Sequence, residues 1–113
     1  MLDEGESSMP KYFIAYLGGD QPSSSEEGKK NFARYQEWLA SLGADLVSPM
    51  NPIKNTQTVN PDGSVSESSI TSMSGYTILA AASIEAALEK AKACPFLEVN
   101  GSLEVSELIE MPG

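Results

Sequence analysis

The chain has 113 residues, of which 41% are hydrophobic and 20% are charged. This balance is ordinary for one globular domain and excludes a chain that is disordered throughout. The 16 acidic and 7 basic residues give a formal charge of −9, which disfavours nucleic acid and anionic membrane surfaces as partners, because basic patches bind both.

The ends of the chain predict its location and domain limits. Met1 to Pro10 is acidic and polar and lacks the basic and apolar regions of a signal peptide. No apolar run approaches the roughly 20 residues that span a bilayer. We therefore expect a cytoplasmic protein, with residues 1–8 as a disordered extension and residues 9–113 as a single domain. The functional start is either Met1 or Met9.

The segment from Lys11 to Leu17 predicts the first strand, because aromatic and β-branched residues dominate it and two glycines follow it. Both of its faces are apolar. A two-layer domain covers one face of its sheet with helices and leaves the other to solvent. The second apolar face therefore needs another cover, and a partner subunit in a homodimer is the expected one.

A helix is predicted over residues 25–42. Ser24 and Glu27 have the spacing of a capping box, and Gly43 provides a left-handed stop. The buried face of this helix is expected to carry residues that recur at helical spacing. These are Phe32, Tyr35, Trp38, Leu39 and Leu42.

The middle of the chain predicts a short strand over residues 44–48, which Pro49 should end because proline cannot donate to a ladder. Two polar arms then follow, over residues 54–59 and 64–71. The turn between them holds proline and glycine where a tight turn favours them. We expect this hairpin at an edge of the sheet or protruding from it.

The last third repeats the pattern of strand, helix and strand. A buried strand is predicted over residues 75–81, and Ser83 should cap a second helix that ends at Cys94 and Pro95. Its buried face should carry Ile84, Ala87, Leu88 and Ala91. A final strand is expected over residues 102–111. The order βαββαβ with an inserted hairpin predicts an α+β fold of the ferredoxin-like kind.

The chemistry of the chain is limited by what the sequence lacks. It contains no histidine, which excludes Ser-His-Asp and Cys-His nucleophilic systems. With one cysteine and scattered carboxylates, we expect no metal site, no cofactor and no intrachain disulfide. Gly18-Gly19-Asp20 lacks the spacing of a phosphate loop. Cys94 should be a buried structural residue, because a helix C-terminus opposes a thiolate. Catalytic residues are unknown.

Four residues are the candidate ligand contacts: Tyr12, Tyr16, Tyr76 and Glu107. A tyrosine hydroxyl in a cleft is a good polar contact for an apolar ligand, although the periodicity favours core positions for the tyrosines, including Tyr35. Glu107 shares a face of the last strand with apolar residues. Either a bulge or fraying re-phases the strand, which we favour, or the carboxylate is aimed at a semi-buried place.

Several segments along the chain carry a resemblance to a known family. They are 11–19, 38–43, Pro52 with Thr56, Thr58 and Val59, Asp62-Gly63, 74–76, 93–95 and 103–105. Together they resemble the YCII-related family, particularly its DGPF branch, and the resemblance covers nearly all of residues 9–112. The resemblance implies a single YCII-like domain that forms a dimeric ferredoxin-like α/β barrel, in which two sheets face each other around a cleft.

Two departures from that family limit what the resemblance implies. The Asp-Gly-Pro-Phe segment is absent, and residues 67–74 stand in its place. Some relatives look like enzymes with a His-Asp pair, but this chain has no histidine and has Cys94 where the aspartate would be. No catalytic residue is carried over.

Three functions are compatible with the sequence. The first, which we favour, is a homodimeric binding domain for a small, mostly apolar ligand in the cleft between the sheets. The second is a cofactor-independent enzyme that uses a tyrosine or a carboxylate such as Glu107. The third is a protein-interaction partner linked to transcriptional regulation, because DGPF relatives often accompany sigma factors in genomes.

Overall fold

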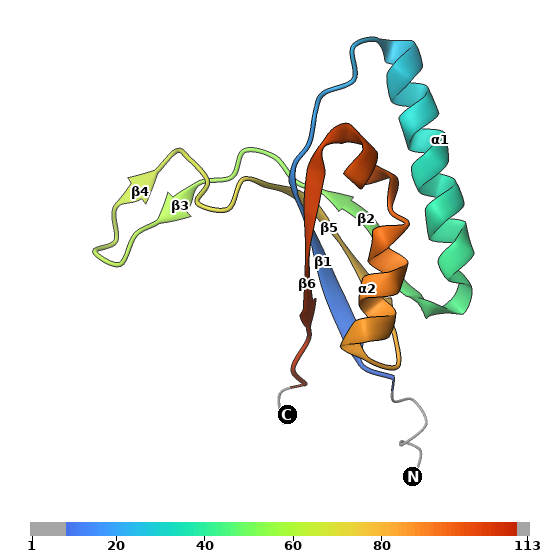
Figure 1. Ribbon diagram of the computed structural model, residues 1–113. Helices are drawn as coiled ribbons and strands as arrows, with labels where there is room; N and C mark the ends of the chain where they lie inside the picture. Colours follow the sequence, from blue (N-terminus) through green and yellow to red (C-terminus); the bar gives the residue numbers. More distant parts are fainter. Residues whose placement is uncertain (1–8, 111–113) are drawn as a thin grey trace.

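The computed structural model describes residues 9–110, which form an α+β domain with both helices on one face of an antiparallel sheet (Figure 1). The predicted α+β class is confirmed. The expectations for residues 1–8, and for the end of the chain beyond residue 110, lie outside the described residues. In the part of the chain that is described, no helix has the length and apolar character needed to cross a membrane.

The main sheet has four strands in the order β2-β5-β1-β6, and every neighbouring pair is antiparallel. The strands are β1 (Lys11–Gly18), β2 (Leu46–Pro52), β5 (Met73–Ala80) and β6 (Gly101–Glu107). The two central strands, β1 and β5, are thus the first strand and the buried strand that the sequence predicts.

The first helix, α1, spans Ser25–Leu42, so its predicted range is confirmed. The Ser24 hydroxyl accepts a hydrogen bond from the Glu27 amide at 3.1 Å. The Glu27 carboxylate accepts hydrogen bonds from the Ser23 amide and hydroxyl. The cap is therefore shared by two serines, a variation on the predicted capping box.

The second helix, α2, spans Ile84–Lys92, and the Ser83 hydroxyl caps it by accepting from the Ala86 amide at 3.1 Å. Two short 3₁₀ helices, η2 (Gly43–Asp45) and η3 (Pro95–Val99), follow α1 and α2. α1 is about 27 Å long and α2 about 13 Å at 1.5 Å per residue. The N-terminal turns of α1 therefore extend past α2 and lie beside η3 (Figure 1).

The core lies between the helices and the sheet. Its centre is formed by one face of β1, one face of β5 and the inner sides of both helices. The indole Nε1 of Trp38 donates to the carbonyl oxygen of Lys90 at 2.9 Å, which joins α1 to the end of α2. The buried hydrophobic residues that form this core cluster are Tyr12, Ile14, Tyr16, Trp38, Leu42, Leu79, Ala81, Ala87, Ala91 and Cys94.

Strand β2 corrects the expectation that Pro49 ends it. The strand continues to Pro52, and Pro49 lies in an irregular stretch between the paired residues Ser48 and Asn51. β2 is an edge strand, where a proline can be accommodated because one side of the strand needs no partner. The Asn51 amide group donates to the Ser48 hydroxyl and the Tyr76 carbonyl, and so supports this stretch.

Three further expectations are corrected. Phe32 and Leu88 were predicted to be buried, but they are 55% and 41% exposed. Phe32 lies on the part of α1 that extends past α2, so no helix covers it. The last strand ends at Glu107, and its pairing with β1 is regular up to that residue. The strand ends early and has no bulge.

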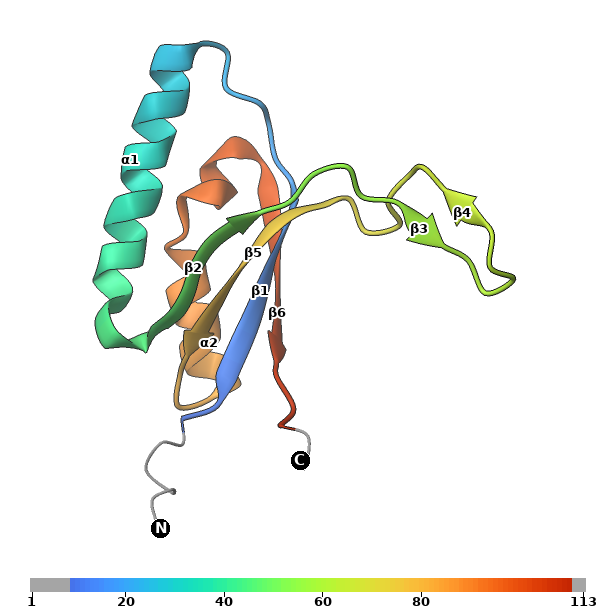
Figure 2. The same cartoon turned by 180° about the vertical axis from the view of Figure 1, so that it is seen from behind.

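The predicted hairpin projects from the domain. Residues 53–72, which we call the arm, contain the short strands β3 (Thr58–Val59) and β4 (Val65–Ser66). The arm leaves the sheet on the side opposite to the helices, and this holds in both views (Figures 1 and 2). With the arm, the molecule measures 48 × 43 × 19 Å.

The second face of the sheet, which we call the open face, lies away from the helices and is covered by none of the described elements (Figures 1 and 2). Phe13 and Tyr76 lie on it, with their rings stacked at 4.9 Å. Ala15 pairs with Tyr76, and Phe13 pairs with Ile78. The centre of this face is therefore apolar, as the sequence of the first strand predicts.

Candidate functional site

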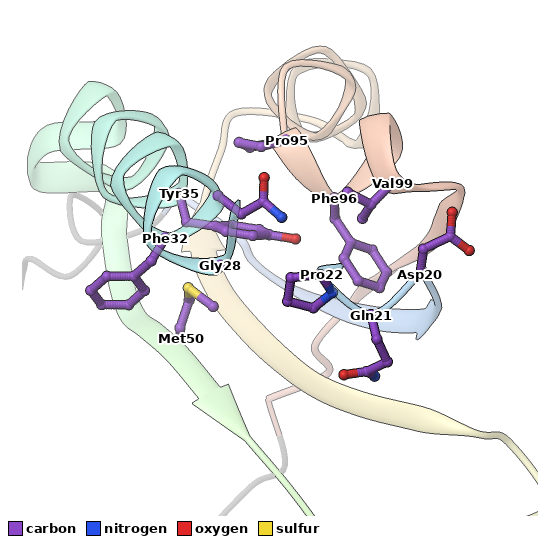
Figure 3. A pocket seen from close by; sticks show the side chains of 11 residues that line it. Asp20, Gln21, Pro22, Gly28, Phe32, Tyr35, Met50, Pro95, Phe96 and Val99 are labelled. Atoms are coloured by element: carbon purple, nitrogen blue, oxygen red, sulfur yellow. The ribbon is translucent and has the colours of Figure 1, made fainter. Parts of the chain in front are cut away.

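A hollow of about 250 Å³ opens between the N-terminal half of α1, the loop after β1, and η3 (Figure 3). It exists because α1 outreaches α2, so that a 3₁₀ helix and a loop take the place of a second helix beside its first turns. The lining residues are Asp20, Gln21, Pro22, Gly28, Asn31, Phe32, Tyr35, Met50, Pro95, Phe96 and Val99. Most of these side chains are apolar, which is typical of small-molecule sites.

The ring of Phe96 forms one wall of the hollow, and two glycines make room for it. A Cβ on Gly19 would lie 2.6 Å from the ring, and a Cβ on Gly101 would overlap its other edge. Gly19 also has a φ of +90°, which a glycine adopts without strain. The Asp20 amide donates to the Val99 carbonyl at 2.7 Å and fixes the loop against η3.

Among the described residues that line the hollow, Tyr35 carries the one phenol. Figure 3 shows its hydroxyl directed from α1 toward Phe96 and Pro22, across the hollow. Burial raises the pKa of Tyr35 well above its ordinary value, so the hydroxyl stays protonated at neutral pH and acts as a donor. Within residues 9–110, the hydroxyl forms no hydrogen bond, whereas that of its neighbour Tyr16 does.

The charge at the hollow is small. Among the described residues that line it, Asp20 is the one with a carboxylate, and none is lysine or arginine. The Asp20 carboxylate points out of the hollow in Figure 3 and accepts a hydrogen bond from the Asn100 side chain at 2.6 Å. The hollow therefore offers nothing to neutralise an anionic ligand.

A second hollow of about 100 Å³ lies next to the first and shares Tyr35, Met50 and Phe96 with it. Tyr16 lines this smaller hollow, and its ring packs edge-on against Tyr35 and Phe96 with centroid distances of 6.4 and 5.2 Å. The Tyr16 hydroxyl forms a hydrogen bond of 2.5 Å with the buried Thr77 hydroxyl. Burial raises the pKa of Tyr16 to about 12.

Cys94 lies behind this aromatic group and is 2% exposed. Burial raises the pKa of its thiol to about 11. At neutral pH the side chain is therefore a thiol and not a thiolate, which agrees with the structural role expected for it.

The four sequence-predicted contacts do not share one site. Tyr16 lies at the smaller hollow. Tyr12 is buried in the core at the other end of β1, where it pairs with Glu107. Glu107 is exposed at the end of β6, and Tyr76 lies on the open face. The structure brings Tyr12 and Glu107 together, and Tyr16 and Tyr76 stand apart from them.

Sequence reasoning did not select Phe32, Met50 or Phe96 as site residues, and it placed Tyr35 in the core. The sequence offered one weak signal, the pair of glycines at the end of β1. It offered no signal that Gly101 and Phe96 lie against that turn, because only the folded chain brings these residues together.

Among the described residues, no three side chains of histidine, cysteine, aspartate or glutamate gather where they could hold a metal ion. The arrangement at the hollow can bind an apolar ring and donate one hydrogen bond to it.

No protein-family model matches the sequence, and no curated protein matches it.

Proposed function

We propose that this chain is a small-ligand-binding domain that acts as a homodimer and holds an apolar ligand in the hollow between α1 and η3. One observation carries the proposal: a protonated Tyr35 hydroxyl without a partner in residues 9–110 points into an open, aromatic-lined hollow. A half-buried hydroxyl without a partner loses part of its hydration, and a ligand acceptor restores the lost hydrogen bond.

The chemistry of the lining selects the class of ligand. Phe96, Tyr35 and Phe32 favour a flat ring, because aromatic rings pack by stacking or edge-on contact. The Tyr35 hydroxyl favours one hydrogen-bond acceptor on that ring, such as a ketone oxygen. The absence of a lysine or arginine in the described lining, with the net charge of −9, disfavours an anion. The ligand is therefore an uncharged aromatic compound with a carbonyl group.

The proposal extends to the finer fold. The strand order β2-β5-β1-β6 with both helices on one face supports the ferredoxin-like βαββαβ arrangement. The apolar open face supports a dimer in which two sheets pack face to face, as in the barrel that the resemblance to YCII-related proteins implies. The hollow lies on the helix side of the sheet, so the ligand site proposed here differs from the cleft between sheets.

The test is a competition experiment with the neutral fluorescent ketone prodan as the probe. The competitors that displace prodan are 2-acetylnaphthalene and 2-ethylnaphthalene, of which only the first has a carbonyl group. We expect the ketone to bind the wild type about 2- to 12-fold more tightly, since one hydrogen bond contributes about 0.5–1.5 kcal/mol. Tyr35→Phe should abolish this preference. Phe32→Ala should weaken the binding of both compounds.

Phe13→Ala on the open face is the matched control, because it removes the same kind of ring from the other side of the sheet. It should leave both affinities unchanged. A wild type that does not bind prodan saturably below the millimolar range contradicts the proposed function. If Phe13→Ala weakens binding and Phe32→Ala does not, the ligand lies between the sheets and the proposed hollow is wrong.

A further inference from the structure

The arm, residues 53–72, carries apolar side chains that its own chain does not cover. Val59, Val65 and Ile70 are 72%, 59% and 82% exposed. The two strands of the arm pair only with each other, through Thr58 with Ser66 and Val59 with Val65. An isolated two-stranded hairpin is at best marginally stable in water. Packing of these side chains against another surface would therefore stabilise the arm.

The conformation of the arm is nevertheless well defined. Its two limbs bend at Asn55 and Ser72, which have φ values of 59° and 57°. The Thr58 hydroxyl donates to the Ser68 carbonyl at 2.7 Å, and the Asp62 carboxylate accepts from the Ser64 amide and hydroxyl at the tip. Side-chain bonds of this kind hold turns in one geometry. These bonds fix the geometry within the arm.

The arm points toward the space in front of the open face. Both views show the helices on one side of the sheet and the arm on the other (Figures 1 and 2). The arm and the open face therefore form the two sides of a corner. A sheet that packs on the open face would lie about 10 Å away. A limb of roughly eight residues spans about 26 Å, so the arm reaches past such a sheet.

We propose that the arm clasps a second copy of this chain that packs on the open face, an inference that rests on the proposed homodimer. A two-fold interface uses the same surfaces of both copies. Each copy here carries exposed apolar side chains on the arm, beside an open face with the half-buried aromatic pair Phe13 and Tyr76 at its centre. The arm has one lysine against one aspartate and one glutamate. The net charge of the arm is therefore only −1, so the arm itself adds little to the repulsion between two acidic chains.

The size of the surfaces agrees with this occupant. A four-stranded sheet face measures about 19 Å by 25 Å, or roughly 480 Å². A stable dimer buries about 800 Å² on each partner. The sheet face alone falls short of that area, and an arm about 26 Å long and 10 Å wide contributes roughly 260 Å² more.

The test measures the dimer dissociation constant of the full chain by sedimentation velocity. The arm variant combines Val59→Asp with Ile70→Asp, and its matched control combines Gln57→Asp with Ser68→Asp, which adds the same charge to exposed polar positions of the arm. We expect the arm variant to raise the dissociation constant at least tenfold and the control to change it less than threefold. Circular dichroism checks that both variants fold.

Hydrogen exchange provides a second readout on the wild-type sequence of the arm. Arm amides should exchange at least tenfold more slowly in the wild-type dimer than in Phe13→Asp, whose charged side chain on the open face should produce a monomer. The clasp is wrong if the arm variant dimerises as tightly as the wild type, or if arm amides exchange equally fast in the wild type and Phe13→Asp. Either outcome leaves the proposed dimer itself standing. A wild type that is monomeric at 100 µM, about the range in which weak dimers still form, overturns both the clasp and the dimer.

Discussion

At the scale of single residues, burial determines the protonation state of Cys94, Tyr16 and Tyr35. Cys94 lies against Tyr16 and Tyr35, and each of the three groups has a raised pKa whose largest cause is loss of water around it. A thiolate or phenolate there would have no cation to stabilise it. The three groups therefore stay neutral at pH 7, and Tyr35 can donate a hydrogen bond to a ligand there.

The stability of the protein should fall with rising pH above about 9. The pKa of Cys94 rises from 9.0 to about 11 on folding, so between these values the unfolded chain loses a proton that the folded chain keeps. The free energy of unfolding then decreases, by at most about 1.4 kcal/mol per pH unit for one group. Urea unfolding at a series of pH values measures this slope.

Cys94→Ala should reduce the slope between about pH 9 and 10, where the unfolded thiol ionises before tyrosine does. The steeper fall above pH 10 should remain, because the pKa of Tyr16 is still raised to about 12. A slope that is the same in both proteins would show that the thiol is solvated in the folded state.

At the scale of elements, helix length and one close contact create the hollow. α1 has 18 residues and α2 has 9, so the first turns of α1 have no helical neighbour. Instead η3 places Phe96 between the turn after β1 and the start of β6, where Gly19 and Gly101 leave room for the ring. The wall of the hollow therefore depends on two glycines that are far apart in the sequence.

Gly101→Ala should destabilise the protein by about 1–3 kcal/mol, the usual cost of adding a methyl group to a filled space. The new Cβ overlaps the Phe96 ring, so the ring must move, and prodan binding should weaken as well. Urea unfolding at pH 7 measures the change in stability.

Gly28→Ala is the control. Its Cβ would lie 3.5 Å from Pro22, an ordinary contact, and alanine stabilises a helix interior by about 0.5–1 kcal/mol relative to glycine. The two variants should therefore change stability in opposite directions. If Gly101→Ala is neutral, Phe96 does not lie between the glycines.

At the scale of the whole molecule, the domain has two unlike sides. The helix side of the sheet is a closed core. On the other side Phe13 and Tyr76 of the open face are half-buried, and Ile70 of the arm is exposed. Exposed apolar side chains that gather on one side of a domain mark an interaction site. The proposed dimer buries both surfaces at once.

If the dimer is the folded form, its stability should depend on protein concentration. Unfolding then includes dissociation, so raising the concentration from 1 to 100 µM should increase the free energy of unfolding by about 2.7 kcal/mol per dimer. Urea midpoints at the two concentrations measure this. Phe13→Asp should remove the dependence, and a wild-type midpoint that does not move with concentration contradicts the dimer.

The sequence by itself determined the features that neighbouring residues encode. The range of α1, its serine cap, the two apolar faces of β1 and the turn of the arm were all predictable. Each depends on periodicity or on side-chain bonds within a few residues, which are the same wherever the segment lies in the fold.

The tertiary structure alone decided where the hollow lies and which residues line it. Phe32 has the spacing of a core residue, yet it is exposed because α1 is longer than α2. β2 runs through Pro49 because it is an edge strand, and Phe96 reaches its place between two distant glycines. Such features follow from how elements of different length meet in space, and local sequence patterns do not contain that information.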